Sequence, residues 1–187
     1  MNRKTINLIV ILSIVVIIIF ISLGYMGFPG INFGSQQPVA PQNDANAEAQ
    51  VILHEIQATG SVSELKYVEL VEGTGAAIAP GDTIQVAYTG ILPNGTVFDA
   101  TEAHGGVPLT LIVAPDGSLM TETGGGLIRG WSLGMAGMKE GGRRLLAIPS
   151  ELGYGANAMG AIPANSTLLF EVEVVKKVSA GSPAIGE

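Results

Sequence analysis

The segment from Val86 to Thr101, VAYTGILPNGTVFDAT, constrains the fold of this chain more than any other segment. Strand-forming apolar residues lie on both sides of an Asn94-Gly95 pair, the typical connection of a tight β-hairpin. We therefore predict two antiparallel strands joined at this pair. The second strand is unusual because Phe98 is followed by an acid, Asp99, where strands disfavour charge. A large hydrophobe beside an acid indicates a site on this strand.

The remaining pattern predicts an α+β domain in which one short helix covers a bent antiparallel sheet. With 10 Pro and 26 Gly among 187 residues, a turn-rich β fold is favoured over a helical bundle. Alternating apolar and polar residues predict strands at Leu65–Glu72, Thr83–Leu92, Thr96–Ala100, Leu109–Val113, Arg143–Ile148 and Leu168–Val178. In the last of these, Phe170, Val172 and Val174 share an apolar face that needs a cover. The segment Leu127–Met138 is the one plausible helix to supply it.

Several motifs in a fixed order extend this interpretation. They are LKYVELVEGTG at 65–75, the hairpin itself, GLIRGW at 126–131, PSELGYG at 149–155 and AIPANSTLLFEVEVV at 161–175. From about Leu65 to Val178, this order resembles the FKBP-type peptidyl-prolyl cis-trans isomerases. The resemblance implies the FKBP-like fold and an enzyme that accelerates X–Pro isomerisation during protein folding; the N-terminal segment described below makes extracytoplasmic proteins the expected clients.

The resemblance also implies a pocket between helix and sheet. Its implied catalytic residues are Asp99, Phe98, Trp131, Tyr154 and Phe170, and its implied substrate-binding residues are Tyr88, Leu109, Leu127, Ile128 and Ile162. Trp131 falls on the position that forms the floor under a proline ring. The Tyr154 hydroxyl and the Ile128 N–H fall on positions that hydrogen-bond ligand carbonyls.

Each of these residues also has an ordinary structural explanation. Aromatic side chains dominate cores, so Trp131 and Phe170 are expected to be buried even without a site. Tyr154 is also explained as part of a turn. Asp99 is harder to explain, because a carboxylate among apolar neighbours is costly unless a partner meets it. A buried pairing with the Tyr88 hydroxyl is its structural alternative.

The implied reaction needs no cofactor, metal or nucleophile. An X–Pro amide isomerises over a barrier of roughly 18–20 kcal/mol, which arises from conjugation between nitrogen and carbonyl. A pocket that removes the carbonyl from water and fits the twisted amide lowers this barrier. Catalysis by shape and desolvation predicts that single substitutions reduce activity in degrees.

Three departures from the family pattern leave a second function open. Leu109-Thr110-Leu111 stands where many active members have aromatic residues, and Ala161 replaces a bulkier residue beside Ile162. The loop Ala114–Gly126 is longer than in minimal members, and its triple glycine indicates mobility near the pocket mouth. The alternative is a non-catalytic, membrane-tethered module that binds proline-containing peptides or acts as a chaperone. The resemblance also implies macrolide inhibitors as ligands, and these departures predict that they bind less tightly.

Composition excludes other classes of function. The chain has no cysteine, which excludes disulfides, thiol catalysis and cysteine-ligated metals. A net charge of −7 argues against nucleic-acid binding. The two histidines, His54 and His104, are too isolated in the sequence for a metal site, and we expect both on the surface.

The N-terminal segment predicts a membrane anchor. Residues Ile6–Phe28 are long enough to cover roughly 30 Å of hydrocarbon as a helix, and Leu8–Leu23 carries no charge. Arg3 and Lys4 precede this segment, so the positive-inside rule places the N-terminus in the cytoplasm and the domain outside it. The alternative is a cleaved signal peptide and a secreted domain, although its apolar core is usually shorter.

The predicted organisation follows from these signals. Residues 1–5 form a cytoplasmic N-terminus, 6–28 the transmembrane anchor, 29–58 a linker, 59–178 the isomerase domain and 179–187 a flexible tail. Within the linker, Gly30 to Asn46 is poor in core residues and indicates a flexible tether. Residues Val51–Ile56 return to apolar alternation, as either an extra strand or a short helix.

Overall fold

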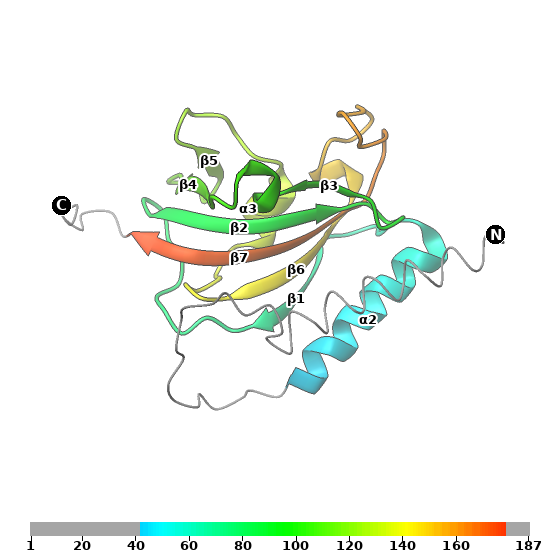
Figure 1. Cartoon of the computed structure of the whole chain (residues 1–187), viewed down its shortest axis with the longest axis horizontal. Coiled ribbons are helices and arrows are strands. Elements are labelled where there is room, and N and C mark those ends of the chain that lie inside the picture. The colour runs from blue at the N-terminus through cyan, green and yellow to red at the C-terminus, as the bar shows by residue number, and fades with distance from the viewer. Residues whose placement is uncertain (1–41, 179–187) are drawn as a thin grey trace. The chain divides into compact units, whose positions relative to one another are not determined.

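An antiparallel sheet organises the computed structural model of the chain, which describes residues 42–178 (Figure 1). Its strands are β1 (Lys66–Val71), β2 (Thr83–Ile91), β3 (Val97–Ala100), β4 (Leu109–Val113), β5 (Leu119–Thr121), β6 (Arg143–Ile148) and β7 (Leu168–Val178). Their order is β1-β6-β7-β2-β4-β5, and β3 pairs with β2 at the side. Every pairing in this sheet is antiparallel. The predicted cytoplasmic N-terminus, membrane segment and C-terminal tail lie outside the described residues.

The hairpin and the predicted strands are confirmed. β2 and β3 pair through Gly90 and Asp99, and the Leu92 N–H donates to the Thr96 carbonyl across the turn. Gly95 has a φ of 86°, a conformation that favours glycine and explains the Asn-Gly signal. The ends of three strands differ from the prediction by a single residue.

One strand was missed in the sequence. β5 lies within the segment Ala114–Gly126, which was interpreted as a mobile loop, and it pairs with β4 through Ile112 and Met120. A tight turn joins the two strands, since the Ala114 N–H donates to the Ser118 carbonyl over 2.8 Å. The extra length of this segment is therefore partly an ordered hairpin.

The short helix α3 (Arg129–Gly134) covers the apolar face of the sheet, as expected. Phe170, Val172 and Val174 of β7 are buried in the same core as Trp131. The helix is shorter than the predicted Leu127–Met138. Its last turn ends before Gly137, whose φ of 74° lies in the left-handed region.

A second helix, α2 (Gln42–Thr59), covers the opposite face of the sheet (Figure 1). Ile52 and Ile56, one turn apart, are buried against residues of β1, β6 and β7 that point away from α3; these are Val68, Ala147 and Leu169. The helix occupies part of the range 29–58, for which the sequence predicted a linker. The segment Val51–Ile56, for which the sequence left a strand and a short helix open, is helical. Among residues 42–178, no helix has the length and apolarity to cross a membrane.

α3 approaches β6 closely because two of its residues are glycines. A Cβ on Gly130 would lie 2.3 Å from Ile148 Cγ2, and one on Gly134 would lie 2.9 Å from Leu146 Cδ2. The buried Arg144 side chain fixes the far end of the helix, since its Nη1 donates to the Gly134 carbonyl over 2.5 Å. The same guanidinium pairs with Glu69 of β1. Helix, β6 and β1 are thereby joined.

We expect Gly130→Ala to destabilise the domain by about 1–3 kcal/mol, because the new methyl group meets Ile148 in a packed core. The sign of this change in stability is informative, because replacing a glycine by alanine inside a helix ordinarily stabilises the protein. Chemical denaturation followed by circular dichroism measures the change.

Gly126→Ala is the matched control, because no atom lies within 4 Å of its Cβ position. The double variant Gly130→Ala/Ile148→Ala should lose less stability than the sum of the losses measured in the two single variants. Unchanged or increased stability of Gly130→Ala would show that α3 has room to move.

Candidate active site

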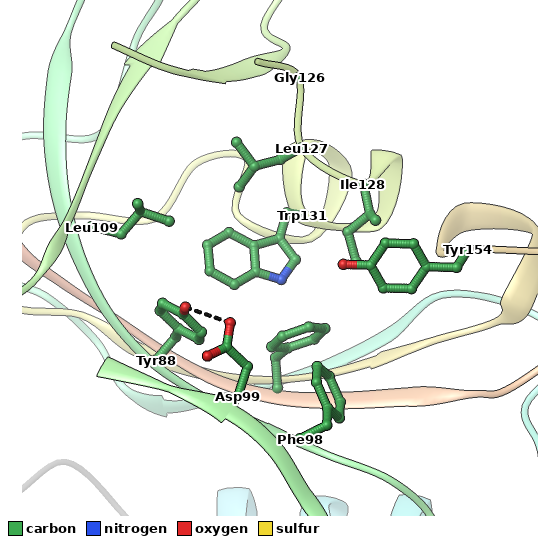
Figure 2. A pocket seen from close by; sticks show the side chains of 10 residues that line it. Tyr88, Phe98, Asp99, Leu109, Gly126, Leu127, Ile128, Trp131 and Tyr154 are labelled. Carbon is green, nitrogen blue, oxygen red and sulfur yellow. Dashed lines mark hydrogen bonds between the residues drawn. The ribbon is translucent and has the colours of Figure 1, made fainter. Parts of the chain in front are cut away.

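A cavity of about 230 Å³ lies where α3 faces the β2–β3 hairpin (Figure 2). Its lining consists of Tyr88, Phe98, Asp99, Leu109, Gly126, Leu127, Ile128, Trp131, Tyr154 and Phe170. Pockets for drug-sized ligands usually measure roughly 300–1,000 Å³. The present cavity therefore suits a single ring with its adjoining backbone.

All the site residues predicted from the sequence line this cavity except Ile162. Ile162 is buried in the adjoining hydrophobic core and bridges to Met159. Gly126 lines the cavity and was not predicted. The triple glycine that it ends was interpreted as a mobile loop, although glycine beside a pocket also permits close approach of a ligand.

Aromatic rings pack edge to face around the cavity. Trp131 lies between Tyr88 and Phe170, with ring centroids 5.3 Å and 5.2 Å away. Phe98 meets Phe170 at 5.4 Å with the rings at 90°. Gly90 of β2 makes room for this pair, because a Cβ there would lie 2.6 Å from Phe98 Cζ. Only 2% of Trp131 is exposed, because the indole packs against its neighbours on nearly every side. A ligand in the cavity therefore meets a rigid floor.

Asp99 is paired rather than isolated. The Tyr88 hydroxyl donates to Asp99 Oδ2 over 2.8 Å, the pairing that the sequence offered as the structural alternative (Figure 2). The Ala100 N–H donates to Asp99 Oδ1 over 2.9 Å, and His104 Nε2 lies 2.8 Å from the same oxygen. His104 is exposed, as expected, but its contact with Asp99 was not predicted. The 3-10 turn η1 (Thr101–His104) brings the imidazole back toward the carboxylate.

Burial and hydrogen bonds act in opposite directions on Asp99. Desolvation raises its pKa, whereas the hydrogen bonds from Tyr88, His104 and Ala100 lower it, and the pKa lies below its ordinary value in balance. Burial raises the pKa of Tyr88, and the hydrogen bond to the Asp99 carboxylate raises it further. Burial likewise raises the pKa of Tyr154. At neutral pH, both phenols therefore remain donors and Asp99 remains an anion.

Three donors beside the cavity have no partner within residues 42–178. The buried Trp131 Nε1–H has none, and no hydrogen bond of the described chain uses the Ile128 N–H or the Tyr154 hydroxyl. Figure 2 shows the Tyr154 hydroxyl turned toward the indole. Buried donors in folded proteins are nearly always paired. This arrangement is therefore suited to a ligand that brings carbonyl oxygens and an apolar ring, as a prolyl peptide does.

The comparisons with known proteins agree with this geometry. A model of the family described as FKBP-type peptidyl-prolyl cis-trans isomerase matches residues 75–175. An FK506-binding protein of Neisseria meningitidis serogroup B is 47% identical over 109 residues, which cover 58% of this chain and 91% of that protein. FK506-binding protein 4 of Chaetomium thermophilum is 42% identical over 104 residues, or 56% of this chain, and the match spans 19% of that longer protein.

Solved structures show the same similarity. The crystal structure of FkpA from Escherichia coli superposes with a TM-score of 0.54 at 32% identity, covering 73% of this chain and 61% of that one. The crystal structure of AtFKBP13 gives a TM-score of 0.53 at 35% identity, covering 63% of this chain and 96% of that one. Because the family model matches more than half of the sequence, the chain belongs to the FKBP-type peptidyl-prolyl cis-trans isomerase family.

Proposed function

We propose that this chain accelerates X–Pro isomerisation in proteins that fold outside the cytoplasm and that the cavity on Trp131 is its active site. The observation that carries the proposal is the cavity itself, where an aromatic floor lies beside unpaired donors. The similarity to FkpA and to the Neisseria protein supports a role in folding. The clients are proline-containing polypeptides.

The mechanism follows from the lining. The proline ring rests on Trp131 beside the packed rings of Phe98 and Phe170, and contact with these aromatic surfaces displaces water from it. A carbonyl in this environment loses the hydration that favours the planar, conjugated amide. The Ile128 N–H and the Tyr154 hydroxyl hold the neighbouring carbonyls, and the rigid floor favours the twisted amide over either planar form. The Asp99 anion keeps Tyr88 in place through its hydrogen bond.

Two observations favour the non-catalytic alternative. Leu109 provides a small aliphatic wall, and the cavity is smaller than the usual ligand pocket. A module that binds prolyl peptides without accelerating their isomerisation would use the same floor. The same features predict weak binding of macrolides.

We further propose that the segment Ile6–Phe28 anchors the chain in a membrane, with residues 1–5 in the cytoplasm and the domain outside. The support is the uncharged apolar run and the preceding Arg3 and Lys4. In this organisation residues 29–41 tether the domain, and 179–187 form a tail. Release of the domain after signal cleavage is the competing possibility.

Trp131→Leu and Asp99→Val are expected to lower kcat/KM for a Leu-Pro peptide in a full-length preparation in detergent. Loss of the aromatic floor should cost about twofold to tenfold, because aromatic contacts contribute about 0.5–1.5 kcal/mol beyond burial. Asp99→Val leaves the Tyr88 hydroxyl without its partner and should also reduce activity in degree.

Circular dichroism of both variants controls for folding. No acceleration by the folded parent chain would contradict catalysis. If the peptide nevertheless changes the fluorescence of the single tryptophan, the binding alternative is supported.

The depressed pKa of Asp99 predicts a pH-dependent contribution to stability. A carboxyl group whose pKa is lower in the folded state stabilises the fold above its unfolded pKa, and this contribution disappears as pH falls through the folded pKa. Asp99→Asn should therefore be less stable than the parent at neutral pH. Urea denaturation at a series of pH values should show the two proteins converging in acid, and a constant difference would contradict this assignment.

The anchor proposal predicts that the full chain stays in the membrane fraction after alkaline carbonate extraction. Deleting residues 6–28 should release it, because the apolar run supplies the attachment. Protease added outside the cell should digest the domain. A soluble chain with a new N-terminus downstream of Phe28 would instead establish signal cleavage.

A further inference from the structure

A second cavity, of about 560 Å³, adjoins the proline pocket. It shares Tyr88, Asp99 and Leu109 with that pocket, so the two cavities are neighbours on the same face. Its remaining lining consists of His104, Val107, Pro108, Thr110, Thr121, Glu122 and Thr123. A polypeptide whose proline occupies the first cavity must continue past its mouth, and the second cavity offers a place for the next side chain.

The two walls of this second cavity differ in character. One wall is apolar and consists of Val107, Pro108 and Leu109 before and at the start of β4, with 68% of Val107 exposed. The other is polar and consists of Thr121, Glu122 and Thr123, where the β5 hairpin turns back toward α3. The apolar wall suits a hydrocarbon stem, and the polar wall suits its terminal group.

The polar wall is held by hydrogen bonds at Thr121, and it carries the carboxylate of Glu122. The Gly125 N–H donates to Thr121 Oγ1 over 3.0 Å, and Thr121 Oγ1 lies 3.0 Å from Thr123 Oγ1. Between these two threonines, Glu122 is exposed, and none of the hydrogen bonds or ion pairs of residues 42–178 involves it. Its carboxylate is therefore available to a ligand.

The charge balance of the lining favours a cation. Asp99 and Glu122 are the carboxylates of this cavity, and His104, the basic group of the lining, is already engaged with Asp99. Lysine and arginine carry long hydrocarbon stems that pack on apolar surface while the charged end reaches polar surroundings. Such a side chain matches an apolar wall that faces a free carboxylate.

We propose that this second cavity selects clients with a lysine or arginine next to the isomerised proline. The stem lies along Val107 and Leu109, and the charged end reaches Glu122. This inference rests on the proposed isomerase function, because it deepens the substrate class of the same site. Since both charges remain partly in water, the preference should be modest, about twofold to fivefold in kcat/KM.

The experiment uses the full-length chain in detergent and two series of prolyl peptides. In one series the residue before proline is Lys, Gln or Glu, and in the other the residue after proline varies in the same way. In one of the two series, the Lys peptide should exceed the Gln peptide by about twofold to fivefold, and the Glu peptide should be poorest. The preference should shrink as salt is raised.

Glu122→Gln should bring the Lys-to-Gln ratio of kcat/KM close to one, and Glu122→Lys should reverse the preference toward the Glu peptide. Glu64→Gln is the matched control, because it removes the same charge from an exposed position outside both cavities. This control should keep the ratio of the parent chain. Comparing peptides on one enzyme makes the ratio independent of differences in folding between variants.

The outcomes separate the two proposals. If no peptide is accelerated, the isomerase function fails and this inference fails with it. If neutral peptides are accelerated but neither series shows a charge preference, the inference alone is overturned. A preference that survives in Glu122→Gln would also overturn it, because the selecting charge would then lie elsewhere.

Discussion

The structure depends on how closely α3 approaches the sheet. Gly130 and Gly134 bring the helix backbone against Ile148 and Leu146, nearer than any larger residues would permit. Trp131, between them in sequence, is consequently seated with its ring against Tyr88 and Phe170. Arg144 holds the C-terminal end of the helix by its carbonyls and so fixes it along the sheet. Catalysis by shape requires a rigid floor. The pocket must fit the twisted amide of the transition state and must not adapt to the planar amide of the ground state.

The site also shows how a pocket is prepared without catalytic groups in the usual sense. The Asp99 carboxylate accepts hydrogen bonds from the Tyr88 hydroxyl and the Ala100 N–H. The first of these bonds fixes the position of the Tyr88 phenol ring. The Trp131 Nε1–H and the Ile128 N–H remain unpaired within the described chain. The polar groups that shape the cavity wall are thus hydrogen-bonded to one another, whereas the donors that face a ligand have no partner within the described chain. Polar groups of one cavity therefore have two roles: some hold the lining in position and others are available to bind a ligand.

Sequence patterns predicted the hairpin and the faces of β7 because both depend on local rules: an Asn-Gly turn and a two-residue alternation. The site was predicted through motif order, whereas Ile162 shows that a position beside a pocket need not line it. β5 was missed, although Asp116-Gly117 carries the same kind of turn signal, because the triple glycine dominated the interpretation. The contact between His104 and Asp99 depends on tertiary geometry, which no spacing rule encodes.

The position of α2 has a consequence for how clients reach the protein. The helix packs through Ile52 and Ile56 on the face of the sheet opposite α3, and an ion pair between Glu55 and Lys66 of β1 adds to this attachment. Within the described residues, α2 therefore lies on the other side of the sheet from the cavity. A nascent or unfolded polypeptide approaching the pocket does not have to compete for space with this helix. The sheet separates the face that packs against α2 from the face that carries the cavity, so substitutions on one face need not alter the other.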